Sequence, residues 1–197
     1  MTIDTLSFEQ EIRNYLLEQR WPFNDQTRAY HELDFTLLLP AGVRFHLEAK
    51  EKQKPYNPRS WPAFAPEPDL FILDDLTVRK CLAFSPRAGV VVKDAPGGRY
   101  LFFSVVDLAL MPRQRVNRAI EKNTRELKGK WLIDLRNGNT APGMHELMGF
   151  VDGYIDQLNT LLFEMHACYG DYVGENIGEG GVVRQPSHWD KDVRSTR

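Results

Sequence analysis

The chain has 197 residues, 42% of them hydrophobic, which is enough to bury one core and predicts a single domain. Its formal net charge of −2 gives no overall attraction to a phosphate backbone, which excludes a histone-like or polybasic binder. The N-terminal residues lack the basic start and apolar run of a secretory signal, and no stretch is long and uncharged enough to span a bilayer, so we expect a soluble, cytoplasmic protein without a membrane partner.

The first predicted element is an amphipathic helix over residues 7–20. Phe8, Ile12 and Leu16 recur at helical spacing, and Ser7 precedes them as the expected N-cap. The helix should end before the Trp-Pro pair that follows, because proline disfavours helical geometry in the residue before it.

A β-hairpin is predicted over residues 31–50, where the hydrophobic period changes to two. Residues 40–42, Pro-Ala-Gly, form its turn. A slip of one residue would send the apolar set of one strand to the wrong face, so the pattern fixes the register and places Asp34 opposite Glu48. The same register pairs Glu32 with Lys50 and Thr36 with His46. One face of the hairpin is therefore expected to carry Glu32, Asp34, Thr36, His46, Glu48 and Lys50.

The middle of the chain is predicted to complete a mixed α/β core. Residues 51–68 are rich in Pro, Lys and aromatics without a period, which indicates a loop. Helical spacing returns from Leu73 to Phe84. The apolar runs at residues 89–92 and 100–106 predict strands that are covered on both faces, and Trp131 to Leu135 is a further predicted strand.

The C-terminal part is predicted as a long added helix. Met144 to Met165 carry one apolar stripe, which either packs on the domain or forms the seam of a homodimer. We expect a core over residues 1–136, a helical segment over 137–170 and a flexible tail over 171–197. Cys81 and Cys168 lack the spacing of a zinc site, and both are predicted to be buried and reduced.

The polar face of the hairpin could hold a divalent metal. Directly opposed side chains have their Cβ atoms about 5 Å apart, so Asp34 and Glu48 would repel one another unless a cation lay between them. Carboxylate oxygens suit Mg²⁺ or Mn²⁺. Lys50, on the same face, could position a water molecule or stabilise negative charge. The competing interpretation is a plain interaction module, because polar residues of an alternating hairpin usually face water.

These residues resemble those of a known group of nucleases. Asp34 followed by Glu48-Ala49-Lys50 is similar to the signature of the PD-(D/E)XK superfamily, with Leu33 at the position of the proline. The helix segment Phe8-Glu9-Gln10-Glu11-Ile12 resembles the glutamate-bearing helix of archaeal Holliday junction resolvases. The resemblance implies a restriction-endonuclease-like α/β fold of order αβββαβ, flanked by helices, with its first strand near residues 21–29 and the long C-terminal helix as an addition.

The resemblance also implies an activity, a Mg²⁺- or Mn²⁺-dependent endonuclease that hydrolyses phosphodiester bonds in DNA. The alternative is an inactive member of the same fold that binds nucleic acid or a protein partner. Glu9 would be the helix carboxylate, with Glu11 as the second choice, and Glu32 could bind metal or pair with Lys50. The implied catalytic residues are Glu9, Asp34, Glu48 and Lys50, and the implied metal-binding residues are Asp34, Glu48 and Ala49.

Two segments combine the cations and aromatic or polar side chains that suit contact with nucleic acid. One directly follows the second strand of the hairpin, and the other lies in residues 113–130, which contain seven Lys and Arg residues. Solvated surface charge is the alternative explanation for both. The predicted nucleic-acid-binding residues are Lys52, Gln53, Lys54, Tyr56, Arg59, Arg113, Arg115 and Arg118.

Overall fold

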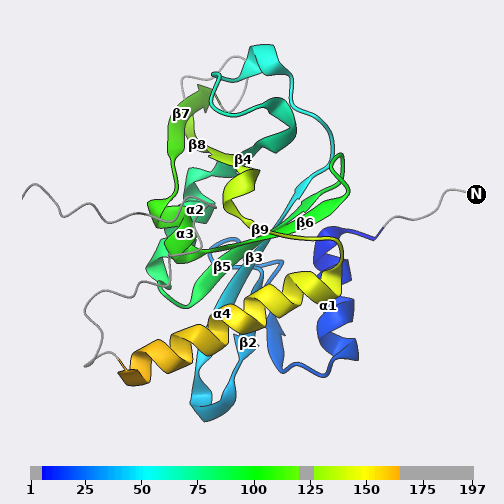
Figure 1. The fold of residues 1–197 in the computed structure, drawn as a ribbon, viewed down its shortest axis with the longest axis vertical. Helices are drawn as coiled ribbons and strands as arrows, with labels where there is room; N and C mark the ends of the chain where they lie inside the picture. The colour runs from blue at the N-terminus through cyan, green and yellow to red at the C-terminus, as the bar shows by residue number, and fades with distance from the viewer. Residues whose placement is uncertain (1–5, 120–126, 165–197) are drawn as a thin grey trace, which may run out of the picture.

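The computed structural model describes residues 6–119 and 127–164, and side chains as far as residue 158. A six-stranded mixed sheet forms its centre, and a three-stranded antiparallel sheet lies beside it (Figure 1). In chain order, the helices and strands are α1 (Phe8–Glu18), β1 (Phe23–Asp25), β2 (Phe35–Leu38), β3 (Arg44–Lys52), β4 (Leu70–Asp74), α2 (Asp75–Ala83), β5 (Ala88–Asp94), β6 (Arg99–Ser104), α3 (Val105–Leu110), β7 (Arg113–Ala119), β8 (Leu127–Asp134), β9 (Asn139–Ala141) and α4 (Met144–Glu164).

The central sheet and its helices follow one another along the chain in the predicted αβββαβ order, with β4 of the second sheet inserted before α2. Its strands are arranged β1-β2-β3-β5-β6-β9, and among these six described strands only β3 and β5 are parallel. The chain passes from β3 through β4 and α2 before it enters β5, so α2 is the crossover helix that a parallel pair requires. The predicted mixed α/β fold with flanking helices and a long C-terminal helix is confirmed.

The β2–β3 hairpin has the predicted register. Phe35 pairs with Leu47 and Thr36 pairs with His46 across the two strands. In the turn, Ala41 and Gly42 both adopt positive φ angles, of 58° and 74°. The left-handed conformation at two successive residues reverses the chain tightly, and it places apolar side chains of both strands on one face.

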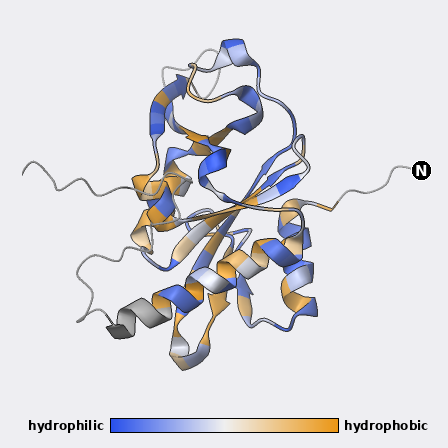
Figure 2. Ribbon diagram, in the orientation of Figure 1, coloured by the Kyte–Doolittle hydropathy of each residue, from blue (hydrophilic) through white to orange (hydrophobic). Residues whose placement is uncertain are grey.

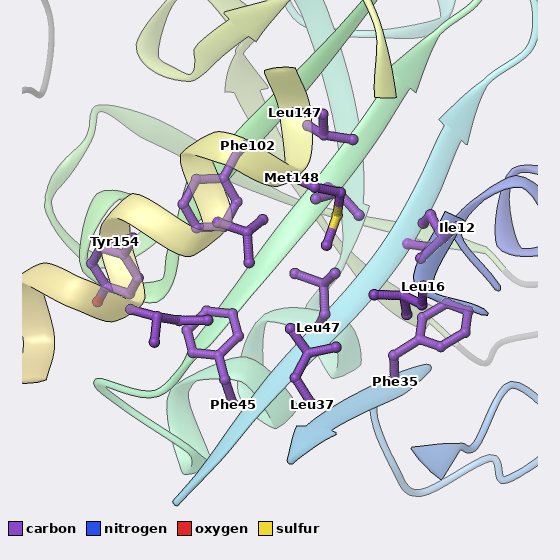
Figure 3. Close-up of a cluster of buried hydrophobic side chains, with 14 of the residues drawn as sticks. Ile12, Leu16, Phe35, Leu37, Phe45, Leu47, Phe102, Leu147, Met148 and Tyr154 are labelled. Carbon is purple, nitrogen blue, oxygen red and sulfur yellow. The ribbon is translucent and has the colours of Figure 1, made fainter. Parts of the chain in front are cut away.

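Two hydrophobic clusters cover the two faces of the central sheet. Figure 3 shows one of them, where Ile12 from α1 and Met148 from α4 pack with strand residues such as Phe35 and Leu47. α1 begins at an N-cap by Ser7, as predicted, through a capping box. On the opposite face, α2 and α3 pack against β5 and β6. Both faces of the sheet are therefore buried, which explains why β5 is almost continuously apolar.

The three-stranded sheet was predicted only in part. It has the order β4-β8-β7, and β8 contains most of the strand expected over residues 131–135. β7 was not predicted, because its sequence Arg-Gln-Arg-Val-Asn-Arg-Ala has almost no apolar residues, and it is nearly all exposed. Figure 2 shows β7 as a mainly hydrophilic strand. Its position beside β8 places the basic segment at a sheet edge.

Two predicted boundaries in the middle of the chain are wrong. The helix expected from Leu73 begins two residues later, because residues 70–74 form β4 and pair with β8. The strand expected over residues 100–106 ends at Ser104, because the hydroxyl of Ser104 accepts the backbone N–H of Asp107 and starts α3.

Cys81 is buried and free, as predicted, whereas Cys168 and the expected tail lie outside the described residues. Within residues 6–119 and 127–164, no helix has the length and hydropathy required to cross a membrane.

Candidate active site

Asp34, Glu48 and Lys50 lie together at the junction of β2 and β3. Asp34 directly precedes β2, and Glu48 and Lys50 project from the same face of β3. The Lys50 Nζ atom is 2.5 Å from Glu48 Oε1 and 3.9 Å from Asp34 Oδ2. The Ala49 backbone N–H donates to Asp34 Oδ2 at 2.9 Å, which holds the Asp34 carboxylate at the edge of β3. The hairpin thus brings two carboxylates and an amine together.

Glu48 is buried, and its two oxygens have different environments. Its side chain is only 4% exposed. Oε1 accepts hydrogen bonds from Lys50 Nζ and from the Thr77 hydroxyl, at 2.5 and 3.3 Å. Oε2 is the one buried side-chain polar atom in the described part of the chain that has no hydrogen-bond partner. Because an unpaired buried carboxylate oxygen is costly, this atom suits a cation ligand.

The surroundings of the site raise the pKa of both Asp34 and Lys50, with different consequences for their charge. Burial, together with the charge of Glu48, raises the pKa of Asp34 to about 6, although Lys50 and the Ala49 N–H act in the opposite direction. Burial opposes the charge of Lys50, but Glu48 and Asp34 outweigh it, so the pKa of Lys50 lies above its ordinary value. Lys50 is therefore cationic at neutral pH, while Asp34 retains a proton until the solution is nearly neutral.

Of the two glutamates in the first turn of α1, Glu9 acts on the site. Its charge contributes to raising the pKa of both Asp34 and Lys50. Glu11 instead forms an ion pair with Lys93 and accepts a hydrogen bond from the Tyr100 hydroxyl at 3.2 Å. Glu11 thus ties α1 to β5 and β6, and Glu9 is the helix carboxylate associated with Asp34 and Lys50.

Glu32 does not occupy the predicted position opposite Lys50. β2 begins only at Phe35, and Glu32 lies in the preceding turn, where its N–H donates to the Ala29 carbonyl. Its carboxylate accepts a hydrogen bond from the Gln26 side chain. In the described part of the chain, the carboxylates paired with Lys50 are those of Asp34 and Glu48. Because Glu32 lies in the turn before β2, the alternation of polar and apolar residues predicted its position wrongly.

Lys52 was predicted to contact nucleic acid, and this prediction is wrong. The side chain is 1% exposed, and its Nζ atom donates to the carbonyl oxygens of Glu67 and Pro68 at 2.8 and 3.1 Å. The same atom lies 3.2 Å from Glu67 Oε1. The loop after β3 returns over Lys52 and buries it, so its ammonium fixes the loop and is not accessible to a phosphate.

The remaining residues of the loop and of β7 meet at one surface. The guanidinium of Arg118 lies 4.5 Å from the centre of the Trp61 ring and donates to the Ser60 carbonyl. Tyr56 is half-buried, and its ring lies edge-on to Trp61 at 6.4 Å. Three predicted nucleic-acid-binding residues of this loop, Gln53, Lys54 and Arg59, are exposed.

The predicted arginines of β7 are exposed but have partners within the protein. Arg113 donates to the Leu108 carbonyl at 2.7 Å and lies over the Trp131 ring. Arg115 pairs with Asp75 at 3.0 Å. A guanidinium has five donors, so each arginine keeps donors for a further acceptor, but part of the positive charge is already compensated.

Thr77 is a residue of the site that the sequence did not reveal. It is the third residue of α2, it is buried, and its hydroxyl donates to Glu48 Oε1. Glu48 and Thr77 are 29 residues apart in the chain. No motif marks this threonine, and only the packing of α2 on β3 brings it to the carboxylate.

The metal-binding potential of the site rests on few side chains. In residues 6–119 and 127–158, no group of three or more His, Cys, Asp and Glu side chains is arranged to hold a metal ion. Asp34 and Glu48 form a pair of carboxylates. A pair suits Mg²⁺ or Mn²⁺, which keep several waters and use one or two carboxylates, and does not suit a structural zinc site.

Comparisons with known proteins give a likeness to a solved structure. No family model matches the sequence, and no curated protein matches it. The structure is similar to that of Hjc, a Holliday junction resolvase from Archaeoglobus fulgidus, with a TM-score of 0.36 and 15% sequence identity, over 64% of this chain and 93% of that chain.

Proposed function

We propose that the chain is a metal-dependent phosphodiesterase, and specifically an endonuclease that acts on DNA in the cytoplasm. The observation that carries this proposal is the buried Glu48 carboxylate, which has one oxygen without a partner beside a second carboxylate and a lysine. A protein surface that is merely solvated has no need of such a buried arrangement, because burial of an uncompensated charge destabilises the fold.

Asp34 and Glu48 would hold the metal through their carboxylate oxygens. The Ala49 carbonyl is a further candidate ligand, because the N–H and C=O of a strand residue point to the same side and the Ala49 N–H points to Asp34. When bound, Mg²⁺ or Mn²⁺ lowers the pKa of a coordinated water and offsets negative charge on the phosphate. Asp34, with a raised pKa, would lose its proton on binding the ion.

Lys50 and Glu9 have complementary roles in this proposal. The ammonium of Lys50, already held at Glu48, offsets negative charge that develops on the phosphate or positions the attacking water. The carboxylate of Glu9 accepts a hydrogen bond from that water and keeps it near the site. Lys54 and Arg59, exposed after β3, would contact the DNA backbone.

The test is to incubate the wild-type protein and the Lys50→Ala variant with plasmid, linear duplex, four-way junction and single-stranded DNA, with and without Mg²⁺ or Mn²⁺. We expect metal-dependent cleavage by the wild type and a loss of about 100-fold or more in the variant, because Lys50 acts on the reacting phosphate. Metal binding by the variant should persist. If the wild type binds the metal but cuts none of these substrates, the enzyme assignment is wrong and a nucleic-acid-binding role replaces it.

A further inference from the structure

A second site lies at the end of β3 opposite to the candidate active site. An open pocket of about 740 Å³ lies between the turn of the β2–β3 hairpin and the segment that joins α2 to β5. Its walls include Arg44, His46, Phe84 and Arg87, with the main chain of neighbouring residues. His46, the lining residue nearest to Glu48 on β3, precedes it by two residues of extended strand, or about 7 Å, and neither Asp34 nor Glu48 lines the pocket.

Two arginines give this pocket its charge. Arg44 is exposed and Arg87 is half-buried. Neither guanidinium pairs with a carboxylate in the part of the chain that the structure describes, whereas Arg13, Arg99 and Arg115 all do. The described lining of the pocket contains no Asp or Glu. Two uncompensated guanidinium groups at one pocket favour an anion, and phosphate oxygens match their donor geometry.

An aromatic pair forms the other recognition element. The rings of His46 and Phe84 stack, with their centroids 3.9 Å apart and an angle of 23° between the planes. The Thr36 hydroxyl lies 3.0 Å from His46 Nδ1 and fixes the orientation of the ring. Phe84 remains 38% exposed, which leaves a flat apolar surface at the pocket.

We propose that this pocket binds a nucleotide, with its phosphate at Arg44 and Arg87 and its base stacked against Phe84. The pocket lies in the size range of small-molecule sites. Base stacking on an aromatic ring and arginine contacts to phosphate are the two interactions by which proteins hold nucleotides without reading their sequence. The ligand could be a free nucleotide or the 5′-terminal nucleotide of a DNA strand, which present the same groups. The proposal does not depend on the nuclease activity.

The test is isothermal titration of the full chain with AMP, adenosine, inorganic phosphate and a short 5′-phosphorylated oligonucleotide. All titrations contain EDTA, so that no metal engages the candidate active site. We expect AMP to bind more tightly than adenosine or phosphate. The double substitution Arg44→Ala with Arg87→Ala should weaken AMP binding by about ten-fold or more, as expected for loss of charge-assisted hydrogen bonds. Phe84→Ala should weaken AMP binding but leave phosphate binding unchanged.

Arg28→Ala is the matched control, since Arg28 is an exposed arginine that lines a different pocket. Arg44→Gln and Phe84→Leu replace the alanine variants if thermal unfolding shows that those do not fold. The proposal is overturned if the wild type does not bind AMP at millimolar concentration, if phosphate binds as tightly as AMP, or if the pocket variants bind AMP as the Arg28 variant does. Tighter binding of the oligonucleotide with the same dependence on Arg44 and Arg87 supports a strand end as the ligand, and tighter binding of AMP supports a free nucleotide.

Discussion

Side chains from two elements donate hydrogen bonds to Glu48, and these bonds determine which of its carboxylate oxygens can bind a metal ion. Lys50 on β3 and Thr77 on α2 both donate to Oε1, which leaves Oε2 without a hydrogen bond. Side chains that bond to a metal ligand orient it, and their loss lowers metal affinity even though they never touch the ion. The role of Thr77 in the proposed site is therefore to fix the carboxylate of Glu48.

Removal of the Thr77 hydroxyl tests this role. We expect Thr77→Val to weaken Mn²⁺ binding by about ten-fold, in the range measured for such outer contacts. Thr77→Ser should restore the affinity, because serine retains the hydroxyl. Titration of the protein with Mn²⁺, monitored by calorimetry, measures both effects. Equal affinities of the valine variant and the wild type would show that Lys50 alone is sufficient to position Glu48.

The raised pKa of Asp34 predicts a pH-dependent effect on stability. Its pKa is about 6 in the folded chain against 3.8 for the ordinary residue, so between these values the folded state holds more protons than the unfolded state. The stability of the metal-free protein should therefore fall as the pH rises through this window. Asp34→Asn mimics the protonated form and should stabilise the metal-free protein by about 1–3 kcal/mol above pH 7.

Urea denaturation in EDTA between pH 4 and pH 8 measures the difference in unfolding free energy between Asp34→Asn and the wild type. It should be smallest at pH 4 and largest at pH 8, and excess Mn²⁺ should reverse the order by stabilising the wild type alone. A constant difference across the pH range would mean that Asp34 ionises normally.

β3 shows how far an element could be predicted from the sequence. The period of two predicted the hairpin and its register, and with them the approach of Asp34, Glu48 and Lys50. Lys52 was predicted to contact nucleic acid because it lies among the cations and aromatics that follow the hairpin, but the loop folds back and buries it. Periodicity reports which face a residue occupies and contains no information on which distant segment covers that face.

Other elements escaped prediction for related reasons. β7 has no hydrophobic pattern, because it is an exposed edge strand that is stabilised by pairing with β8. The last two residues of β4 were assigned to the helix after it, because Leu73 continues the helical spacing of the apolar residues of α2. Thr77 and the pocket at Phe84 depend on where α2 packs. Local patterns therefore predicted the hairpin, its flanking helices and the central residues of the site, whereas contacts between distant segments required the structure.

Lys52 is expected to stabilise the loop between β3 and β4. Lys52→Met keeps the volume of the side chain but removes one donor from each of three acceptors, the Glu67 and Pro68 carbonyls and the Glu67 carboxylate. We expect a loss of about 2 kcal/mol in the free energy of unfolding and faster proteolysis within the loop. Lys54→Met is the matched control, because Lys54 is exposed, and its effect should stay below about 0.5 kcal/mol. Similar effects of both substitutions would contradict the assigned role of Lys52.

At the scale of the whole molecule, the two sheets are joined near the proposed site. Arg118 on β7 contacts Trp61, and Lys52 on β3 fixes the end of the same loop. The loop therefore connects the strand that carries Glu48 to the basic edge of the second sheet. Since the net charge of the chain is −2, attraction to DNA must come from such local surfaces.

The salt dependence of DNA binding measures how much the charged side chains of this surface contribute to binding. Each cation that neutralises a backbone phosphate contributes about 0.9 to the slope of log K against log salt concentration. Replacing Lys54 and Arg59 with alanine should therefore lower the slope by about 2 and weaken binding at low salt. The double variant Arg20→Ala with Arg28→Ala removes the same charge from other exposed positions and should leave the slope unchanged. Equal slopes for both double variants would place the DNA elsewhere.

The crossover helix α2 has a mechanical consequence for both sites. Thr77 lies in its first turn and Phe84 directly follows its last residue, about 10 Å away along a single stiff rod. Cys81 anchors this rod against the sheet between them. A substitution that displaces α2 would therefore disturb both the Glu48 carboxylate and the pocket. Parallel losses of Mn²⁺ affinity and AMP affinity would then identify a displaced helix and not the loss of a single contact.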